Sequence, residues 1–428
     1  MKFDEQRFYT YTRMIQETFY YILDLVKNRL MKNWCNWHKQ PILPEERLVV
    51  TIRLPKQEAW ISSKYLNEMS IHDKLKTSIN SSDNKIKIIF TDNYQYISHG
   101  NFSLVVKHIK SGLKVAFVAP TKTHNVHKKA VLSLSIAENS LAVSSCEEDK
   151  LLVWDSRTSE ILLDLKGHGG PVYKCRFFPS GIVAISAGAD GSCRVWSAET
   201  GINPVTLKGH TMAVTDICII EKGRNVISVS KDGSAKLWDV GESNCIGNVM
   251  EGHGPINCCD LATTADEHGV ENEREVGTSN KLLVVGCESG LVLCSHIAKR
   301  EEIYRKQLQS SCNACIVIDQ TAIVGCADGK MIQLNLNNGD AVSEWNESAS
   351  PVLSMIALPN QLFVVGRQDG TCTVLSLNKS YNMTRVQLTG SDCDGIRDLS
   401  FNGKWIFAGC RDTNVRKYDF NQIIVHYK

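Results

Sequence analysis

The sequence carries almost no net charge, because 48 lysines and arginines stand against 46 aspartates and glutamates, a formal balance of +2. A general binder of nucleic-acid backbones usually has a clear basic excess, so we expect no nucleic-acid partner. No apolar run approaches the roughly 18 to 20 residues that a transmembrane helix needs, which predicts no membrane span. The apolar stretch at residues 19–23 is too short, and too closely followed by charge, for a secretory signal.

The 16 cysteines lack a secretion route, so we interpret them as reduced thiols of a cytosolic or nuclear protein without disulfides. Two pairs suggest metal or redox chemistry: Cys312 and Cys315 form a lone CxxC, and Cys35 lies close to His38. Neither pair has the second half of a zinc site, and Cys315 falls at the repeat position of Cys175, where a small core side chain is expected. The sequence therefore predicts no metal site and no cofactor.

What the sequence does contain is an internal repeat from about residue 113 to the end. Two units match in four residue types, each pair 42 positions apart. The pairs are His168 and His210, Ser186 and Ser228, Asp190 and Asp232, and Trp196 and Trp238. Turn positions then mark seven units, at Glu148, Asp190, Asp232, Ser289, Asp328, Asp369 and Asp412. Each unit contains short β-rich runs separated by turns, without helical periodicity.

Repeats of about 40 residues with Gly-His early and Trp-Asp late resemble the WD-repeat family, in which each repeat forms one four-stranded propeller blade. The Trp-Asp pair is literal at residues 154–155 and 238–239 and decays in later units. The resemblance implies an all-β, seven-bladed propeller over residues 113–428. In the closing arrangement typical of the family, the apolar run 113–118 completes the seventh blade and removes the exposed sheet edges.

The recurring His, Ser, Asp and Trp occupy the positions where this family has a hydrogen-bonded chain, from the turn Asp through His and Ser to the indole N–H. Such a chain satisfies buried polar groups and holds the strands of one blade together. A Ser/His/Asp set also suggests a hydrolase triad, but two copies at repeat spacing favour the structural interpretation. We expect no catalytic residue and no enzymatic activity.

Three segments fall outside the regular repeat. Residues 262–280 form an acidic insertion in blade four, interpreted as a solvated loop, with partner binding as the alternative. Residues 47–112 contain strand-like runs without blade markers, which predicts a small N-terminal domain of β character. Residues 1–46 have apolar side chains at three- and four-residue intervals, typical of an amphipathic helix. That helix could dock on the propeller, bind a partner helix, or be a weakly ordered extension.

Four strings are more particular than the repeat: residues 175–181 (CRFFPSG), 223–228 (GRNVIS), 273–278 (EREVGT) and 388–394 (LTGSDCD). With the acidic insertion, they resemble the proteasomal ATPase-associated factor family, WD-repeat chaperones for assembly of the proteasome regulatory particle base. The string at 273–278 is specific because it lies in a loop where the fold demands no particular residues. The resemblance extends from about Leu48 to Asp419 and leaves out residues 1–46.

The resemblance implies a protein-binding function: the family holds one ATPase subunit by its C-terminal small domain until the base is assembled. A different adaptor, such as a ubiquitin-ligase substrate receptor or a signalling scaffold, would share the propeller but not the strings. We expect a monomer in isolation.

A propeller gathers loops from every blade onto one rigid face, which a partner meets with little ordering cost. Loops entering the blades nominate Tyr173, Thr215, Asn257 and Arg397 as contacts. Residues preceding the turn positions nominate Glu147, Lys231, Glu288 and Arg411. The resemblance implies acidic propeller residues against a basic ATPase surface, so the preferred acids are Asp392, Asp394 and Asp412 of the last blade. For Asp412, the turn position gives a structural alternative.

Overall fold

The structure, a computed structural model, describes residues 49–427 except 54–57, 64–70, 80–85, 90–93, 101, 110–111, 265–272, 346–347, 378–383 and 392–393. The amphipathic helix predicted at 1–46 lies outside the described residues, as does the pair Cys35 and His38. The described part is almost entirely β-structure, with α4 (Phe420–Ile424) as its one helix.

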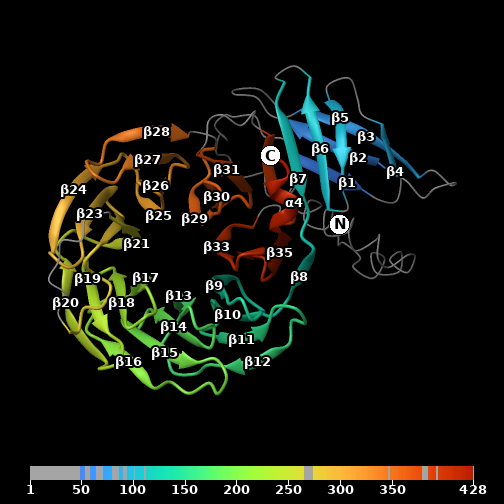
Figure 1. The fold of residues 1–428 in the computed structure, drawn as a ribbon. Coiled ribbons are helices and arrows are strands. Elements are labelled where there is room, and N and C mark those ends of the chain that lie inside the picture. Colours follow the sequence, from blue (N-terminus) through green and yellow to red (C-terminus); the bar gives the residue numbers. More distant parts are fainter. Residues whose placement is uncertain are drawn as a thin grey trace, which may run out of the picture.

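Most strands form sheets arranged around a ring, so the chain is an all-β propeller, as predicted (Figure 1). Six sheets of the ring are four-stranded blades. In chain order of their innermost strands, the first three are β9 (Val131–Ile136), β10 (Leu141–Cys146), β11 (Leu151–Asp155) and β12 (Ile161–Asp164); β13 (Val172–Phe177), β14 (Val183–Gly188), β15 (Ser192–Ser197) and β16 (Val205–Lys208); and β17 (Val214–Ile220), β18 (Asn225–Ser230), β19 (Ala235–Asp239) and β20 (Asn244–Met250). The other three are β21 (Ile256–Thr263), β22 (Lys281–Cys287), β23 (Leu291–His296) and β24 (Glu301–Gln307); β25 (Cys312–Ile318), β26 (Thr321–Cys326), β27 (Met331–Asn335) and β28 (Ala341–Trp345); and β33 (Ile396–Phe401), β34 (Trp405–Cys410), β35 (Val415–Asp419) and β8 (Lys122–His124).

A seven-stranded sheet lies between the last two of these blades in the ring. Its order is β29 (Val352–Leu358), β30 (Leu362–Arg367), β31 (Cys372–Ser376), β32 (Thr384–Leu388), β7 (Lys114–Val118), β6 (Ser103–His108) and β5 (Tyr94–His99). Below, each sheet of the ring is named by its innermost strand. Innermost strands contact their neighbours in the sequence β9, β13, β17, β21, β25, β29 and β33, and β33 contacts β9.

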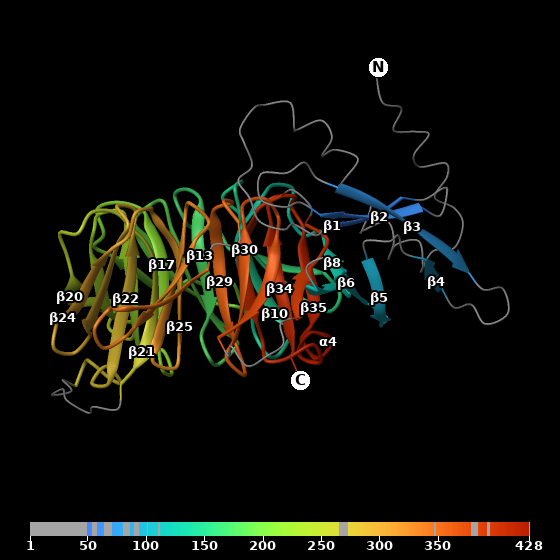
Figure 2. The ribbon, with the colours of Figure 1, turned by 90° about the horizontal axis from the view of Figure 1, so that it is seen from above.

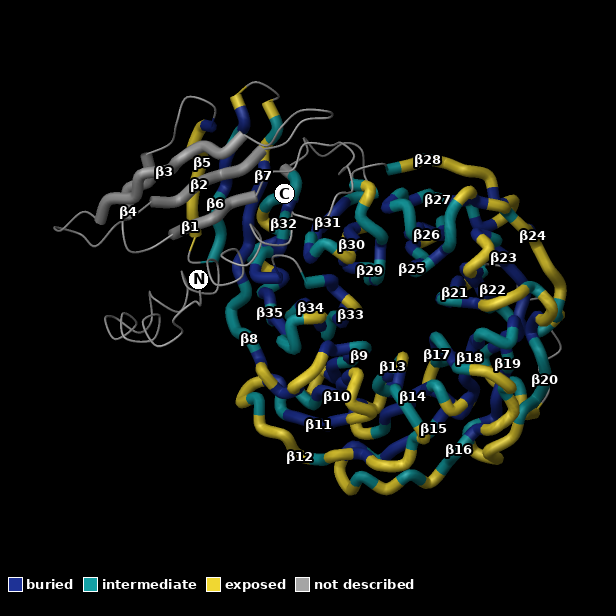
Figure 3. The backbone as a smooth tube through the Cα atoms, turned by 180° about the vertical axis from the view of Figure 1, so that it is seen from behind, coloured by how far each residue is buried: buried dark blue, intermediate teal, exposed yellow. Residues whose placement is uncertain are grey.

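Apolar cores lie between neighbouring sheets rather than within one sheet. Val143 and Val153 of the β9 sheet, for example, share a buried cluster with Trp196 of the β13 sheet. The outermost strands are the most exposed, as β12, β24 and β28 show (Figure 3). A sheet packed on both faces but wet at its outer edge accounts for apolar inner strands and polar outer ones.

The ring closes through a different strand from the one predicted. The apolar run 113–118 does not complete the last blade, because β7 pairs in parallel with β32 and antiparallel with β6. The closing strand is β8, whose Lys122–His124 pairs antiparallel with β35. The physical reason is exposure: an outermost strand suits the polar sequence of β8, whereas β7 lies between two strands and buries its residues 115–118.

The boundary predicted between residues 112 and 113 is also wrong, since it separates the paired strands β6 and β7. Upstream, β1 (Val49–Arg53), β2 (Glu58–Ser63), β3 (Ile71–Ile79) and β4 (Ile86–Ile89) form an antiparallel sheet of their own beside the ring (Figures 1 and 2). At the other end, α4 packs Phe420 and Ile423 into the core shared by the β29 and β33 sheets. The Tyr427 hydroxyl then donates to the Val374 carbonyl at 2.6 Å.

Candidate partner-binding face

One face of the ring carries both the loops that enter the innermost strands and the turns that follow the second strands; we name it the entry face. In each sheet of the ring, the residue before the turn marker donates its N–H to a carbonyl of the entering loop, at 2.9 to 3.1 Å. The pairs are Glu147 to Ala130, Ala189 to Pro171, Lys231 to Ala213, Glu288 to Pro255, Ala327 to Ser311, Gln368 to Pro351 and Arg411 to Gly395. These repeated bonds place the two sets of nominated contact positions on the same face.

Beneath the entry face, the structure brings the predicted His, Ser, Asp and Trp together. In the β13 sheet, the Trp196 indole N–H donates to Ser186 Oγ at 2.8 Å, and Ser186 Oγ lies 2.7 Å from His168 Nε2. His168 Nδ1 lies 3.0 Å from Asp190 Oδ2. Because Ser186 Oγ accepts the indole N–H, its own hydrogen is available to Nε2, which leaves the Nδ1 proton for Asp190.

The β17 sheet repeats the same chain of contacts. His210 Nδ1 lies 2.8 Å from Asp232 Oδ2, and its Nε2 lies 2.7 Å from Ser228 Oγ. The Trp238 indole N–H donates to Ser228 Oγ at 2.8 Å. Ser186 and Ser228 are fully buried, so no substrate can reach either hydroxyl, and the contacts act to join strands.

Burial sets the protonation of these histidines. It lowers the pKa of His168 and of His210 below the ordinary value, against the opposing effect of the neighbouring aspartates. Burial alone would raise the pKa of Asp190, but hydrogen bonds from the Gly169 N–H and from Ser192 outweigh it and bring the pKa to about 2. At neutral pH the chain therefore joins a neutral imidazole to a carboxylate.

A third copy, in the β9 sheet, was missed from the sequence. Ser144 Oγ lies 2.7 Å from His127 Nε2 and accepts the Trp154 indole N–H at 2.9 Å. His127 precedes its serine by 17 positions, whereas His168 precedes Ser186 by 18, so the comparison in register passed over it. The turn marker Glu148 is exposed, and buried His127 Nδ1 has no hydrogen-bond partner. The one-residue offset, with a Ser and a Trp in register, was the available signal.

His127 predicts a measurable acid sensitivity. Burial, and then Lys150, lowers its pKa from 6.5 to about 4, so the unfolded chain takes up this proton first as the pH falls. Its contribution to stability is present above pH 6.5 and is lost progressively toward pH 4. We expect His127→Asn to reduce the stability difference between pH 7 and pH 5 by about 1 to 2 kcal/mol. Urea unfolding of both proteins at the two pH values measures it, and identical pH dependence would contradict the assignment.

The nominated contact residues divide by exposure. Tyr173, Arg397, Arg411, Glu147 and Glu288 are exposed on the entry face, Tyr173 by 41%. Lys231 Nζ forms an ion pair with Glu288 Oε2 at 2.7 Å and bonds to Asn257 Oδ1 at 2.6 Å.

Thr215 and Asn257 also tie neighbouring sheets together. The Thr215 hydroxyl donates to the Ile256 carbonyl at 2.8 Å, and Asn257 Nδ2 donates to the Cys312 carbonyl at 2.8 Å. Both side chains are therefore engaged within the propeller.

The three preferred acids have different positions. Asp412 forms an ion pair with Arg416, whose side chain is only 1% exposed, so this carboxylate balances a buried cation. Asp394 is half-buried and donates its N–H to the Ser391 carbonyl. Asp392 lies outside the described residues.

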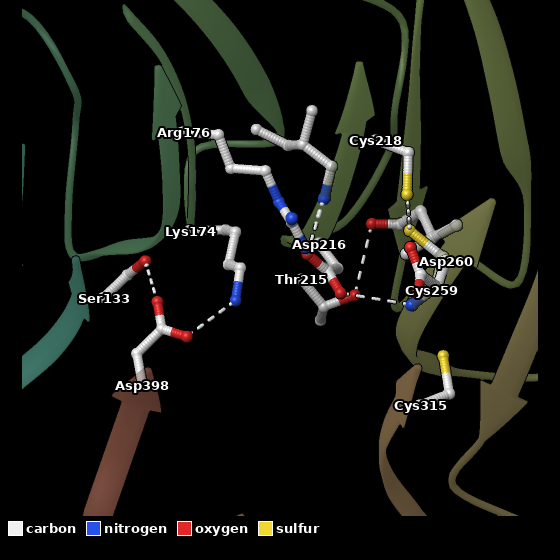
Figure 4. A network of polar contacts seen from close by, with 12 residues as sticks. Ser133, Lys174, Arg176, Thr215, Asp216, Cys218, Cys259, Asp260, Cys315 and Asp398 are labelled. Atoms are coloured by element: carbon white, nitrogen blue, oxygen red, sulfur yellow. Dashed lines mark hydrogen bonds and ion pairs between the residues drawn. The ribbon is translucent and has the colours of Figure 1, made fainter. Parts of the chain in front are cut away.

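Carboxylates around the central channel fasten the innermost strands to one another (Figure 4). Asp398 Oδ2 of β33 accepts from Ser133 Oγ at 2.6 Å and from the Leu134 N–H at 3.0 Å, both of β9. Lys174 Nζ of β13 lies 2.9 Å from Asp398 Oδ1. One side chain thus joins three consecutive sheets across the point where the ring closes.

The same device continues around the channel. Asp216 Oδ2 of β17 accepts the Cys259 N–H of β21 at 3.1 Å, and Asp260 Oδ2 accepts the Val317 N–H of β25 at 2.7 Å. Arg176 forms an ion pair with Asp216 Oδ1 at 3.4 Å. Sequence reasoning missed these residues, although a charged side chain recurs at the third position of β13, β17 and β33. They make the ring a rigid support for the entry face.

The cysteines of the described residues are free thiols, and all but Cys245 are buried. Cys312 and Cys315 both lie on β25, within the apolar core. Across the described parts of the chain, no three His, Cys, Asp or Glu side chains are grouped so as to hold a metal ion. No helix in those parts is long and apolar enough to cross a membrane.

Comparison with known proteins decides the family. The WD domain, G-beta repeat family matches residues 159–197, 202–239 and 383–419. Proteasomal ATPase-associated factor 1 of Homo sapiens is 35% identical over 384 residues, which cover 87% of this chain and 96% of that protein. The chain belongs to the proteasomal ATPase-associated factor family. The Gallus gallus protein of that name is 34% identical with the same coverage, and the probable Dictyostelium discoideum one is 36% identical over 81% of this chain.

Two of the strings that indicated this family contact each other. Buried Asn225, in the string 223–228, donates from Nδ2 to the Arg274 carbonyl at 2.8 Å and accepts the Val276 N–H at 2.8 Å. Arg300 forms an ion pair with Glu275 at 3.0 Å. The end of the acidic insertion is therefore packed against the β17 sheet, and the prediction of a solvated loop is wrong for residues 273–278.

Proposed function

We propose that this chain is a non-enzymatic assembly chaperone of the 26S proteasome regulatory particle base, which holds one ATPase subunit through that subunit's C-terminal domain. The observation that carries the proposal is the match along 96% of a relative named for association with a proteasomal ATPase. Such a protein would act in the cytosol, and in the nucleus where proteasomes are assembled there, as a monomer before it binds its partner.

The entry face is the proposed binding surface. Its loops are tied to the adjoining turns by backbone bonds in every sheet of the ring, and the sheets are fastened to one another around the channel. A surface held in this way loses little conformational entropy when a partner binds. Exposed Tyr173 offers the aromatic contact that protein interfaces favour, with charged residues around it.

We also propose that the ring functions as seven blades, with the first four strands of the β29 sheet forming the sixth in chain order. Those strands have the same consecutive order as the other blades, and β29 lies between β25 and β33 in the ring. The additional strands β7, β6 and β5 would then extend that blade outward and attach the N-terminal part of the chain. A crystal structure of the full chain would test this blade count.

Binding to separately purified C-terminal domains of the six regulatory-particle ATPases tests the proposed partner. We expect one domain to bind at a one-to-one ratio, and the others to bind much more weakly. Failure of all the domains to bind would contradict the proposal. Recovery of a ubiquitin-ligase core protein as the cellular partner would favour the adaptor alternative instead.

Charge reversal on the entry face tests where the ATPase binds. We expect Glu147→Lys combined with Asp394→Lys to weaken binding of the ATPase domain by about tenfold at low salt, because both acids would face a basic partner. Calorimetric titration measures the affinity, and thermal melting monitors the fold. Glu199→Lys, an exposed acid after the third strand of its blade, is the control and should bind normally. Equal affinity of the double variant and the unmodified chain would place the site elsewhere.

A further inference from the structure

A group of positively charged side chains surrounds Trp405, away from the entry face. Lys417 Nζ lies 4.2 Å from the centre of the Trp405 ring and Lys404 Nζ lies 5.2 Å from it. Lys122 Nζ donates to the backbone carbonyl of Arg157. We call Lys122, Arg157, Lys404, Trp405 and Lys417 the Trp405 cluster.

The topology explains why these residues meet. Phe407, Lys417 and Lys122 are aligned across β34, β35 and β8, so they lie on one face of the β33 sheet. Phe407 packs into the core shared with the β9 sheet, and Trp405 packs against that core. Arg157 comes from the turn after β11 of the β9 sheet. The cluster therefore lies where the last and first blades meet.

The cations of the cluster have few acids to balance them. Asp155 accepts from the Arg157 N–H at 2.6 Å and from Arg157 Nη2 at 2.8 Å, so its carboxylate is already engaged. Asp419, opposite Trp405 on β35, accepts the Asn421 N–H and caps α4. Among the described residues, no carboxylate forms an ion pair with Lys122, Lys404 or Lys417.

The crowding of like charge is visible at Lys417. Its burial, followed by the charges of Lys122 and Lys404, lowers the pKa of this ammonium group. The same burial, with Lys122 and Lys417, brings the pKa of neighbouring His124 to about 4. A bound anion would relieve this repulsion, and the Trp405 ring would form one wall of its site.

We propose that the Trp405 cluster binds a short acidic segment of a protein partner. Charge decides between a peptide and a nucleic acid. The chain has a formal net charge of only +2, and Asp155 and Asp419 border the cluster. A continuous polyphosphate would meet those carboxylates, whereas a few peptide carboxylates can pair with the lysines alone. The site is independent of the proposed chaperone function, because it uses neither the entry face nor an ATPase.

Fluorescence anisotropy of a labelled oligoglutamate peptide, titrated with the full chain at low salt, tests the proposal. We expect saturable binding that high salt abolishes, with no binding of an oligoglutamine peptide of equal length. The double variant Lys404→Gln, Lys417→Gln should lose at least about tenfold in affinity. Lys222→Gln removes an exposed lysine at a distant turn of the β17 sheet and should bind as the unmodified chain does.

Two further measurements keep a structural role distinct from a binding role. A Lys417→Gln variant that melts at a lower temperature but binds the peptide normally would overturn the proposal, because the cluster would then only support the fold. Tighter binding of a single-stranded oligonucleotide of matched charge would overturn the choice of a protein ligand. Equal affinity of the double variant and the Lys222→Gln control would overturn the site itself.

Discussion

Replacement of Trp196 by alanine is expected to lower the free energy of unfolding by about 3 to 5 kcal/mol. The indole is 1% exposed and belongs to the core between the β9 and β13 sheets, so its removal leaves a large cavity. The change also removes the N–H that Ser186 Oγ accepts at 2.8 Å, at one end of the chain that leads through His168 to Asp190.

Urea unfolding at pH 7, followed by circular dichroism, measures this loss. Tyr173→Ala is the control, since that aromatic ring is 41% exposed and its removal should change stability by less than about 0.5 kcal/mol. Losses of similar size in the two variants would contradict the position assigned to Trp196. Partner binding by the folded fraction of Trp196→Ala should persist, because the indole lies beneath the entry face.

Replacement of Asp398 by alanine is expected to destabilise the fold by about 3 to 5 kcal/mol, comparable to the loss of Trp196. The carboxylate accepts from Ser133 and Leu134 and balances Lys174, so its removal leaves a buried cation and two donors without their acceptor. The damage falls where the last and first blades meet, and it should open the ring rather than one blade.

A double variant separates this charge effect from a general loss of packing. Asp398→Ala with Lys174→Met removes both charges, and we expect it to recover part of the lost stability. Asp164→Ala, in an exposed ion pair with Lys150, should change stability by about 1 kcal/mol or less. If Asp398→Ala resembled Asp164→Ala, the channel carboxylates would not hold the ring together.

The parts of the fold that could be predicted from the sequence depend on repeated local chemistry. A Gly-His, a Ser and a Trp recur at fixed spacing because each unit builds the same buried hydrogen-bonded chain, so two copies identify it. The turn markers could be placed even in degenerate units, because a hairpin turn restricts its residues wherever it occurs. His127 escaped detection through a change of one residue in spacing.

The parts that could not be predicted depend on which strands become neighbours. Apolarity suggested that the run 113–118 closes the ring, but an outermost strand is half-exposed, and the polar strand β8 fits that position. The roles of Asp216, Asp260 and Asp398 require knowledge of which backbone N–H faces each carboxylate from the next sheet. Asn225 likewise binds residues 274 and 276, about 50 positions away, which no local pattern reveals.

Affinity purification of the tagged chain from cells, with identification of the proteins that it recovers, tests the central claim most directly. The account predicts recovery of an ATPase subunit of the regulatory particle base in complexes that lack the mature 26S particle. Recovery of mature 26S particles only, or of no ATPase subunit, would contradict it.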